Sequence, residues 1–222
     1  MQEDAERGFR IEPHVLKAAE CDSVLAALDD MPRSRAGARH VLSVPAVSAL
    51  ACDARLAGLA RSFLGTEPFP YRATLFEKSA DSNWLVVWHQ DTALPFRERF
   101  ASDGWGPWSV KDGVLYSHAP ASALSRLVAL RVHLDPSEHT NGPLRVVPGS
   151  HRLGVLSDDA ISELVLRSKA VECIVPRGGI LAMRPLLLHA SGKASSRIPR
   201  RVIHIEYADS TTVVPGGELA VA

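Results

Sequence analysis

A histidine and an aspartate stand close together at the end of an apolar run. The run is WLVVWHQD, and it places His89 and Asp91 two positions apart. Because successive side chains of a strand point to opposite faces, these two would lie on one face and could share a metal ion. Two imidazoles and one carboxylate form the facial ligand set of non-haem iron. The pair alone also fits a chance match or a hydrogen-bonded strand end, so a third ligand is needed.

His189 is the candidate for that third ligand. It ends a second apolar run, LLLHAS, where a buried histidine either bonds a backbone carbonyl or completes a metal site. Arg200 follows at the start of the run RRVIHIEYA, and a short connection would lay this strand beside that of His189. A guanidinium binds carboxylates in a bidentate way. We therefore expect a fixed cation near the metal, with the Ser191 hydroxyl as a further donor on the same strand face as His189.

Short apolar runs separated by Pro, Gly, Asn and Asp fill the chain from Phe69 onward, which is typical of β-sandwiches and barrels. They predict eight strands, a number that suits a jelly roll. A short helix is expected around ISELVLR, between the fourth and fifth strands. The strands are expected within PYRATLFEK, NWLVVWHQD, RLVALRVHLD, PLRVVP, AVECIVP, GILAMRP, LLLHAS and RRVIHIEYA.

Two amphipathic helices are expected ahead of the strands. The first would carry Pro13 in its first turn and continue through apolar residues at three-to-four spacing to Leu28. The second would follow Pro45 and end at Gly65, where a C-terminal cap is expected. The Gly-rich tail after Tyr207 is expected to be weakly structured.

Length and composition indicate a globular chain with one domain. It has 222 residues, of which 46% are hydrophobic and 23% are charged. We expect a single domain over 1–222, with a helical part over about 1–65 and a jelly-roll core over about 69–208.

Charge and hydropathy exclude several classes of partner. Lys and Arg number 25 and so do Asp and Glu, so no overall field draws the chain to nucleic acid or to a membrane surface. No stretch approaches the ~20 apolar residues of a membrane span, and the charged start lacks the apolar run of a signal peptide. We expect a cytoplasmic protein with no nucleic-acid or membrane partner. Its oligomeric state is not predicted, and Cys21, Cys52 and Cys173 are expected to be small core residues.

A long segment between Thr92 and Ser125 lacks a steady period and contains several Pro and Gly. Loops of this length in a compact domain are functional lids or disordered, and Trp105, Trp108 and Tyr116 argue against disorder. Because loops on rigid strands supply most binding surfaces, we favour a substrate-covering loop over a plain surface excursion.

Three segments resemble the phytanoyl-CoA dioxygenase family. They are WHQDT at 88–92, NGPLRVVPGSHRLG at 141–154 and HASGKASSRIPRR at 189–201, and with the strands between them they cover roughly 69–207. The combination is far more specific than any one motif. The resemblance implies a mainly β, cupin-like jelly roll, the double-stranded β-helix, with flanking N-terminal α-helices. This agrees with the predicted strands.

The resemblance also implies roles for individual residues. The family's iron ligands fall on His89, Asp91 and His189, and its cosubstrate-gripping serine and arginine fall on Ser191 and Arg200. The implied activity is that of an Fe(II)- and 2-oxoglutarate-dependent dioxygenase, which consumes O₂ and hydroxylates a substrate C–H bond with release of succinate and CO₂. The carboxylate of Asp91 favours hydroxylation over halogenation. Desaturation and ring formation would use the same residues.

Arg131 stands where some members of this family have an aromatic residue beside the cosubstrate. We expect it to bind the cosubstrate or the substrate, with a structural ion pair as the equal alternative. His133 shares its strand face and could line the same pocket. The substrate is expected to be a small molecule that could carry a carboxylate or phosphate, in a pocket walled by Trp105, Trp108, Arg97, Arg99, Arg131 and Arg145.

Other polar residues are expected outside the metal shell. Gln90 and Arg201 face away by strand alternation, and His151 should bond locally at a turn. No supporting constellation surrounds the remaining histidines, which are expected to be structural or exposed: His14, His40, His118, His139 and His204.

Two other functions remain open. The first is a non-catalytic metal-binding jelly-roll protein that keeps the same three ligands. The second is a zinc or manganese hydrolase, which is disfavoured because no general base stands nearby and Arg200 would lack its cosubstrate.

Overall fold

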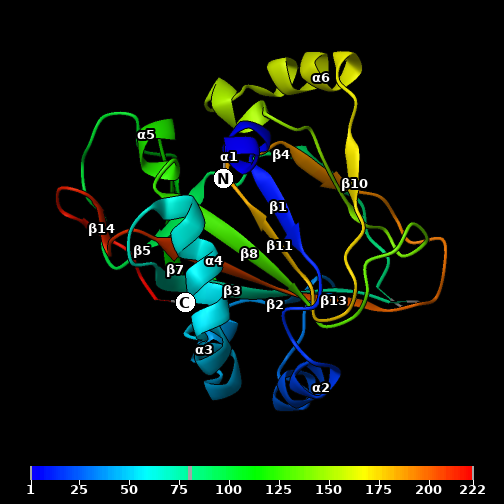
Figure 1. The fold of residues 1–222 in the computed structure, drawn as a ribbon. Coiled ribbons are helices and arrows are strands. Elements are labelled where there is room, and N and C mark those ends of the chain that lie inside the picture. Colours follow the sequence, from blue (N-terminus) through cyan, green and yellow to red (C-terminus); the bar gives the residue numbers. More distant parts are fainter. Residues whose placement is uncertain (1, 80–81, 222) are drawn as a thin grey trace.

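Two facing β-sheets form the body of the molecule, whose computed structural model describes residues 2–79 and 82–221 (Figure 1). All strand pairs within them are antiparallel. The large sheet has the order β1 (Phe9–Glu12), β11 (Ile180–Met183), β8 (Leu127–His133), β13 (Arg200–Ala208), β3 (Phe69–Lys78) and β2 (Gly37–Ala38). The small sheet has the order β10 (Val171–Cys173), β9 (Leu144–Val146), β12 (His189–Ser191) and β4 (Val86–His89). The predicted mainly β jelly roll with flanking helices is confirmed.

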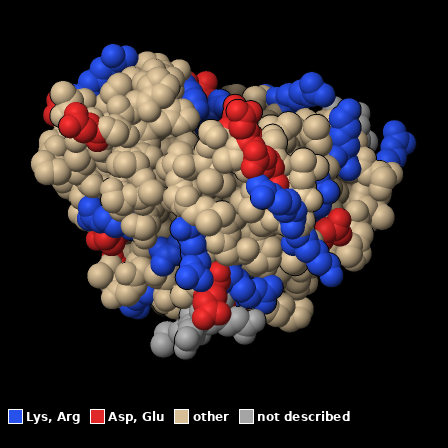
Figure 2. All heavy atoms as spheres, turned by 90° about the horizontal axis from the view of Figure 1, so that it is seen from above, with Lys and Arg blue, Asp and Glu red and all other residues tan. Residues whose placement is uncertain are grey.

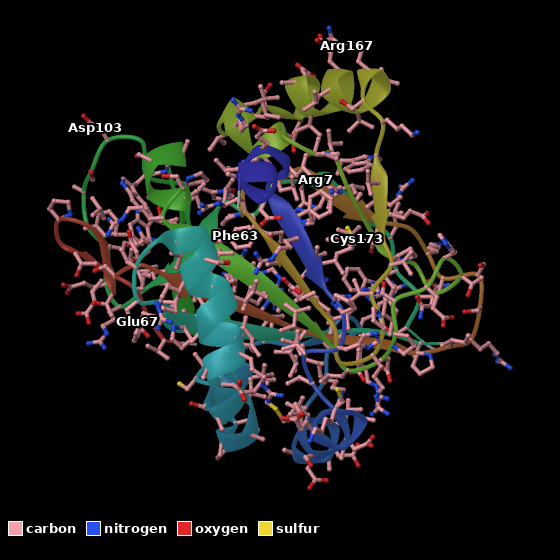
Figure 3. The ribbon with its side chains drawn as sticks, in the orientation of Figure 1. Arg7, Phe63, Glu67, Asp103, Arg167 and Cys173 are labelled. Atoms are coloured by element: carbon pink, nitrogen blue, oxygen red, sulfur yellow. The ribbon has the colours of Figure 1, made fainter. Side chains whose placement is uncertain are left out.

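All eight predicted strands are present in these two sheets. Strands β1 and β2 extend the large sheet at its edges and were not predicted: β1 has the sequence FRIE, in which charged residues alternate with apolar ones, and β2 is only two residues long. The helix expected around ISELVLR is α6 (Asp158–Arg167), which begins after the cap Ser157. Arg167 at its end extends away from the body of the molecule (Figure 3).

The helices before the strands differ from the prediction at their starts. The first long helix, α2 (Ala18–Ala27), begins five residues after Pro13, because His14 adopts a left-handed backbone (φ 65°) and Glu20 caps the Lys17 amide. The second predicted helix is two helices, α3 (Pro45–Ala51) and α4 (Ala54–Leu64), since the Asp53 side chain caps a new start by accepting from the Arg55 amide. Gly65 ends α4 at φ 76°, as predicted. The other short helices are α1 (Gln2–Arg7), η1 (Val41–Ser43), α5 (Ala121–Leu124) and η2 (Ser150–Leu153).

Apolar layers cover both faces of the large sheet. Outside it, Leu56 of α4 and Val47 of α3 pack in one buried cluster with residues such as Ile203, and Figure 1 shows these helices lying across the sheet. Between the sheets, Leu181 packs with Val146 and other side chains of the small sheet. Burial of each such side chain contributes about 1.5–3 kcal/mol, so the two layers hold the strands in a fixed register.

The predicted substrate-covering loop is instead a small antiparallel sheet with the order β5 (Ala93–Phe96), β7 (Val114–His118) and β6 (Trp108–Lys111). Its aromatic rings pack on one another, with Phe96 at 5.4 Å from Trp105 and 5.7 Å from Trp108 between ring centroids. The β5–β6 connection, which carries Asp103, lies at the periphery (Figure 3). The lid prediction is therefore wrong: these aromatic residues form a satellite core.

Two smaller expectations also fail. The tail after Tyr207 is structured, because β14 (Thr212–Val214) and β15 (Gly217–Glu218) form a hairpin that buries Val213 and Leu219. Cys52 is exposed, whereas Cys21 and Cys173 are buried as expected; Figure 3 shows Cys173 inside the molecule.

Basic and acidic side chains are interspersed on the face shown in Figure 2, with no large area of one sign. Within the described part of the chain, no helix is both long and apolar enough to cross a membrane.

Candidate metal centre and cosubstrate pocket

The strands of the small sheet bring the three expected ligands together. His89 ends β4 and His189 begins β12, and the two are direct partners in the antiparallel register. Asp91 follows β4, where its amide donates to the Pro185 carbonyl (2.9 Å). The Nε2 atom of His89 lies 3.7 Å from Asp91 Oδ1, and that of His189 lies 3.6 Å from Asp91 Oδ2. The candidate ligand atoms all lie within 4.8 Å of one another, so one ion could contact all three.

Backbone hydrogen bonds orient both imidazoles. His89 Nδ1 lies 2.8 Å from the Val87 carbonyl oxygen, and His189 Nδ1 lies 2.8 Å from the Leu187 carbonyl oxygen. A carbonyl only accepts, so Nδ1 carries the proton in each ring and Nε2 keeps its lone pair. Metal-binding histidines are commonly fixed in this way. The two rings are therefore set to offer Nε2 to an ion beside Asp91.

The charge states of these groups also suit a metal. Although burial opposes ionisation, the neighbouring His189 and His204 rings hold the pKa of Asp91 well below its usual range. Burial lowers the pKa of His189 to about 4, an effect that the Asp91 carboxylate only partly offsets. At neutral pH the site therefore offers a carboxylate and a neutral imidazole, which are the forms that bind cations.

A buried arginine faces the same cavity from the large sheet. Arg200 begins β13, is only 3% exposed and lines the cavity together with His189 and Ser191. Its Nε donates to the Asn141 carbonyl (3.3 Å), and among the described residues neither Nη atom has a hydrogen-bond partner. Burial and the nearby Arg131 guanidinium lower the pKa of Arg200 to about 9. A free, buried guanidinium fork of this kind suits a carboxylate ligand.

Lys78 adds a second cation beside Arg200. It is the Cα partner of Arg200 in the pairing of β3 with β13, and it is 1% exposed. Its Nζ donates to Ser191 Oγ (2.8 Å) and to the Gly192 carbonyl. Ser191 is thus held by Lys78 in this structure, and its hydroxyl hydrogen remains available to a ligand.

Arg131 of β8 also lines the cavity. Its guanidinium stacks 5.2 Å from the Phe76 ring centroid, and its Nη1 lies 3.1 Å from His204 Nδ1. Its Nε is buried without a hydrogen-bond partner. No carboxylate of the described residues forms an ion pair with it. The alternative of a structural ion pair is therefore not supported, and Arg131 is a cation available to a ligand.

Comparisons with known proteins identify the family of the chain. The pattern of the phytanoyl-CoA dioxygenase family matches residues 10–202. The chain belongs to the phytanoyl-CoA dioxygenase family. It is 28% identical over 235 residues to ectoine dioxygenase of Halomonas elongata, a match that covers 87% of this chain and 64% of that protein. It is 26% identical over 178 residues to L-proline trans-4-hydroxylase of Streptomyces griseoviridis, covering 68% and 59% respectively. The chain thus spans less than two thirds of each relative.

A solved structure shows the same fold. The crystal structure of EctD from S. alaskensis with 2-oxoglutarate and 5-hydroxyectoine superposes with a TM-score of 0.65 at 20% identity, covering 93% of this chain and 74% of that one. At this identity the likeness concerns the fold, which supports the jelly roll described above. In this phytanoyl-CoA dioxygenase family member, the His-Asp-His group lies on and just after two paired strands of the small sheet.

Several residues expected around the substrate of this family member lie elsewhere. Trp105 and Trp108 belong to the satellite core, and Arg99 stacks near Trp108 at 5.8 Å. Arg97 is exposed and pairs with Glu218 (3.2 Å). Arg145 stacks 5.4 Å from the Trp88 ring centroid. None of the five lines the cavity beside the metal group.

The expectations for residues outside the metal shell have mixed outcomes. Gln90 faces away and bonds the Gly154 and Leu186 carbonyls, and Arg201 pairs with Asp135 at 2.6 Å. His133 is buried against the Arg131 carbonyl and does not line the cavity. His151 bonds the distant Ala5 carbonyl at 3.1 Å, so its expected local bond is wrong.

Four polar residues of the cavity region were not predicted. His204 was expected to be structural or exposed, yet its Nε2 lies 3.9 Å from Asp91 Oδ2. Arg72 and Glu206 form a buried pair on the cavity wall, and Lys78 reaches Ser191. A usable signal was the period-two pattern: Arg200, His204 and Glu206 alternate on one face of the same predicted strand.

Proposed function

We propose that this chain is an Fe(II)- and 2-oxoglutarate-dependent dioxygenase that hydroxylates a C–H bond of a small molecule. His89, Asp91 and His189 hold the iron, and Arg200 and Ser191 bind the distal carboxylate of 2-oxoglutarate. Arg131 contributes a further cation to the cosubstrate. Family membership supports the assignment, as does the fold.

One observation carries this proposal: the convergence of three metal-competent atoms beside a buried guanidinium with a free fork. The candidate ligand atoms lie within 4.8 Å of one another, and Arg200 is 3% exposed with no carboxylate paired to it among residues 2–79 and 82–221. A buried charge is costly unless it is paired. The residues therefore fit both parts of the proposed complex, a divalent cation and an anionic cosubstrate.

The iron and 2-oxoglutarate, when bound, supply the oxidising chemistry: O₂ is consumed, 2-oxoglutarate yields succinate and CO₂, and one oxygen atom enters the substrate C–H bond. The protein supplies position. The Val87 and Leu187 carbonyls fix the two imidazoles, so the ligands need no rearrangement. Arg200 and Lys78 set the cosubstrate's direction, and the apolar rings of Phe76 and Trp84 line the cavity and limit water around it.

The proposed substrate is a small molecule with an anionic group. Two relatives are named for ectoine and for L-proline, both small molecules. In this chain the cavity wall carries Arg72, Arg131 and Arg200, which favour anionic ligands.

Succinate formation tests the proposal. Purified protein is incubated with 2-oxoglutarate, O₂ and either Fe(II) or Zn(II), and succinate is measured by mass spectrometry. We expect succinate with Fe(II) and none with Zn(II), because zinc has no redox chemistry. Asp91→Ala should form no succinate with either metal. Metal binding without succinate under any condition would instead support the non-catalytic metal-binding jelly-roll protein, and turnover of an ester with zinc would support the hydrolase.

A further inference from the structure

A buried ion pair lies on the cavity wall beyond the metal group. Arg72 of β3 and Glu206 of β13 are direct partners in the strand register, and the Arg72 Nε donates to Glu206 Oε2. Glu206 is 3% exposed and Arg72 14%. Because the register shifts after Glu206, Tyr71 of β3 has no partner on β13. The Tyr71 hydroxyl donates to Glu206 Oε1 (3.1 Å). Glu206 is therefore fully engaged in holding Arg72 in place.

This pair lies at the opposite end of the cavity from the proposed cosubstrate site. Arg200 and Glu206 are six residues apart on β13, or roughly 20 Å along a strand. A five-carbon dicarboxylate is no longer than about two extended residues, roughly 7 Å, which is short compared with this separation along the strand. His204 stands between Arg200 and Glu206 on β13, and its Nε2 lies 3.9 Å from Asp91 Oδ2 and 3.9 Å from Glu206 Oε2. Arg72 is thus close to the metal group but on its far side.

Arg72 retains hydrogen-bonding capacity toward the cavity. Its Nη1 donates to the Ala93 carbonyl (3.1 Å), and its Nη2 has no hydrogen-bond partner in the part of the chain that the structure describes. Although burial opposes the charge, the Glu206 carboxylate raises the pKa of Arg72 further above its ordinary value. The guanidinium therefore stays charged, is fixed by Glu206, and presents a free donor at the wall.

The charges around the cavity leave room for one more anion. Its lining residues include three guanidiniums, of Arg72, Arg131 and Arg200, and two carboxylates, of Asp91 and Glu206. Ferrous iron and doubly charged 2-oxoglutarate together add no net charge. One positive charge therefore remains, and protonation of Glu206 or the charge on Lys78 would only increase this surplus. Buried charge is stable when paired, so the remaining ligand should be negative.

We propose that Arg72, positioned by Glu206 and Tyr71, is the substrate anchor and that it binds a carboxylate of the substrate. This deepens the proposed function and rests on it. A carboxylate on Arg72 places the rest of a small molecule between Arg72 and the metal group, over His204. The acidic group then sets which C–H bond faces the iron.

Paired small acids and amides test the anchor. Protein loaded anaerobically with one equivalent each of Fe(II) and 2-oxoglutarate is titrated calorimetrically with hexanoate, cyclohexanecarboxylate and benzoate, and with the amide of each. At least one acid should bind tenfold or more tightly than its amide. Arg72→Gln should remove this preference and weaken acid binding about 10- to 100-fold, because a charge-assisted hydrogen bond is lost. Its affinity for 2-oxoglutarate should stay within twofold of wild type.

Two further variants make the result decisive. Arg72→Gln/Glu206→Gln avoids a buried unpaired carboxylate and should lose the acid preference in the same way. Arg97→Gln removes an exposed arginine outside the cavity and should keep the preference for the acid. The anchor is overturned if no acid is preferred to its amide, or if both Arg72 variants bind the acid as wild type does. Failure of wild type to bind 2-oxoglutarate would be seen separately and would overturn the proposed function, and the anchor with it.

Discussion

His89 and His189 face each other across two antiparallel strands, with ring centroids 4.2 Å apart. Each ring bonds the carbonyl two residues before it. Both Nε2 atoms lie within 4 Å of the Asp91 carboxylate. This pairing turns two separate sequence motifs into one metal-binding group.

Removal of one imidazole should abolish metal binding. In His189→Ala we expect at least a hundredfold loss of iron affinity, since changes outside the direct ligands alone cost ~10–100-fold. His151→Ala is the matched control, because His151 bonds only the Ala5 carbonyl in the described structure. Equilibrium dialysis measures the effect. If His189→Ala bound iron as tightly as wild type does, the ion would be held elsewhere.

Metal removal should also lower thermal stability. A ligand at a hundred times its Kd stabilises the folded state by about 2.7 kcal/mol, which for a domain of this size corresponds to a Tm change of about 5–10 °C. Chelation should lower the Tm of wild type by this amount and leave that of His189→Ala unchanged. Differential scanning calorimetry gives the answer, and equal shifts in both proteins would contradict a site at His189.

Affinity for 2-oxoglutarate should depend on the charge of Lys78. Burial, and then the nearby Arg200 and Arg131, lower the pKa of Lys78 from 10.5 to about 7. The ammonium form binds an anion better, so affinity should fall by up to about tenfold per pH unit as pH rises above about 7. Without the ligand, folded protein releases the Lys78 proton above pH 7, whereas unfolded protein keeps it up to about pH 10.5. The free-energy cost of burying this charge therefore falls as pH rises from about 7 toward 10.5, and the folded state becomes more stable.

Lys78→Met removes the titrating group and should flatten that pH dependence, whereas Lys169→Met, which changes an exposed lysine, should not. Calorimetric titration of 2-oxoglutarate at pH 6.5, 7.5 and 8.5 compares the three proteins. An unchanged profile in Lys78→Met would mean that Lys78 only supports Ser191.

Local patterns were sufficient to predict eight strands of the two main sheets and to single out the His-Asp-His group. The run WLVVWHQD has strand character by itself, and the spacing of His89 and Asp91 places both on one face. The Arg72–Glu206 pair could not be found in this way, because its members are 134 residues apart and meet only through the register of β3 and β13. His204 appeared isolated for the same reason, since its neighbour Asp91 follows β4 of the other sheet.

The lid was predicted wrongly because a hairpin signal was overlooked. Asp112 and Gly113 adopt φ 49° and 81° between β6 and β7, and Asp-Gly is a strong two-residue hairpin signal. Pro215-Gly216 similarly marks the turn between β14 and β15. In both segments the strands are too short for a period to be recognised.

Replacement of Trp108 should affect stability and not the site. It packs with Phe96 and Phe100 in the satellite core and does not line the cavity. Trp108→Ala should cost about 2–3 kcal/mol of unfolding free energy, less than a fully buried aromatic residue would. Urea denaturation and 2-oxoglutarate titration separate the two effects. Normal stability with lost cosubstrate binding would restore the lid interpretation.

Anaerobic titration with Fe(II) and 2-oxoglutarate tests the central claim most directly, through the weak visible metal-to-ligand charge-transfer band of a chelated complex. We predict that the band appears in wild type, is lost in His89→Ala, and needs at least tenfold more 2-oxoglutarate in Arg200→Ala, because the buried guanidinium no longer pairs with the cosubstrate. Iron binding in wild type without any band would contradict the account and leave the chain a metal-binding jelly roll.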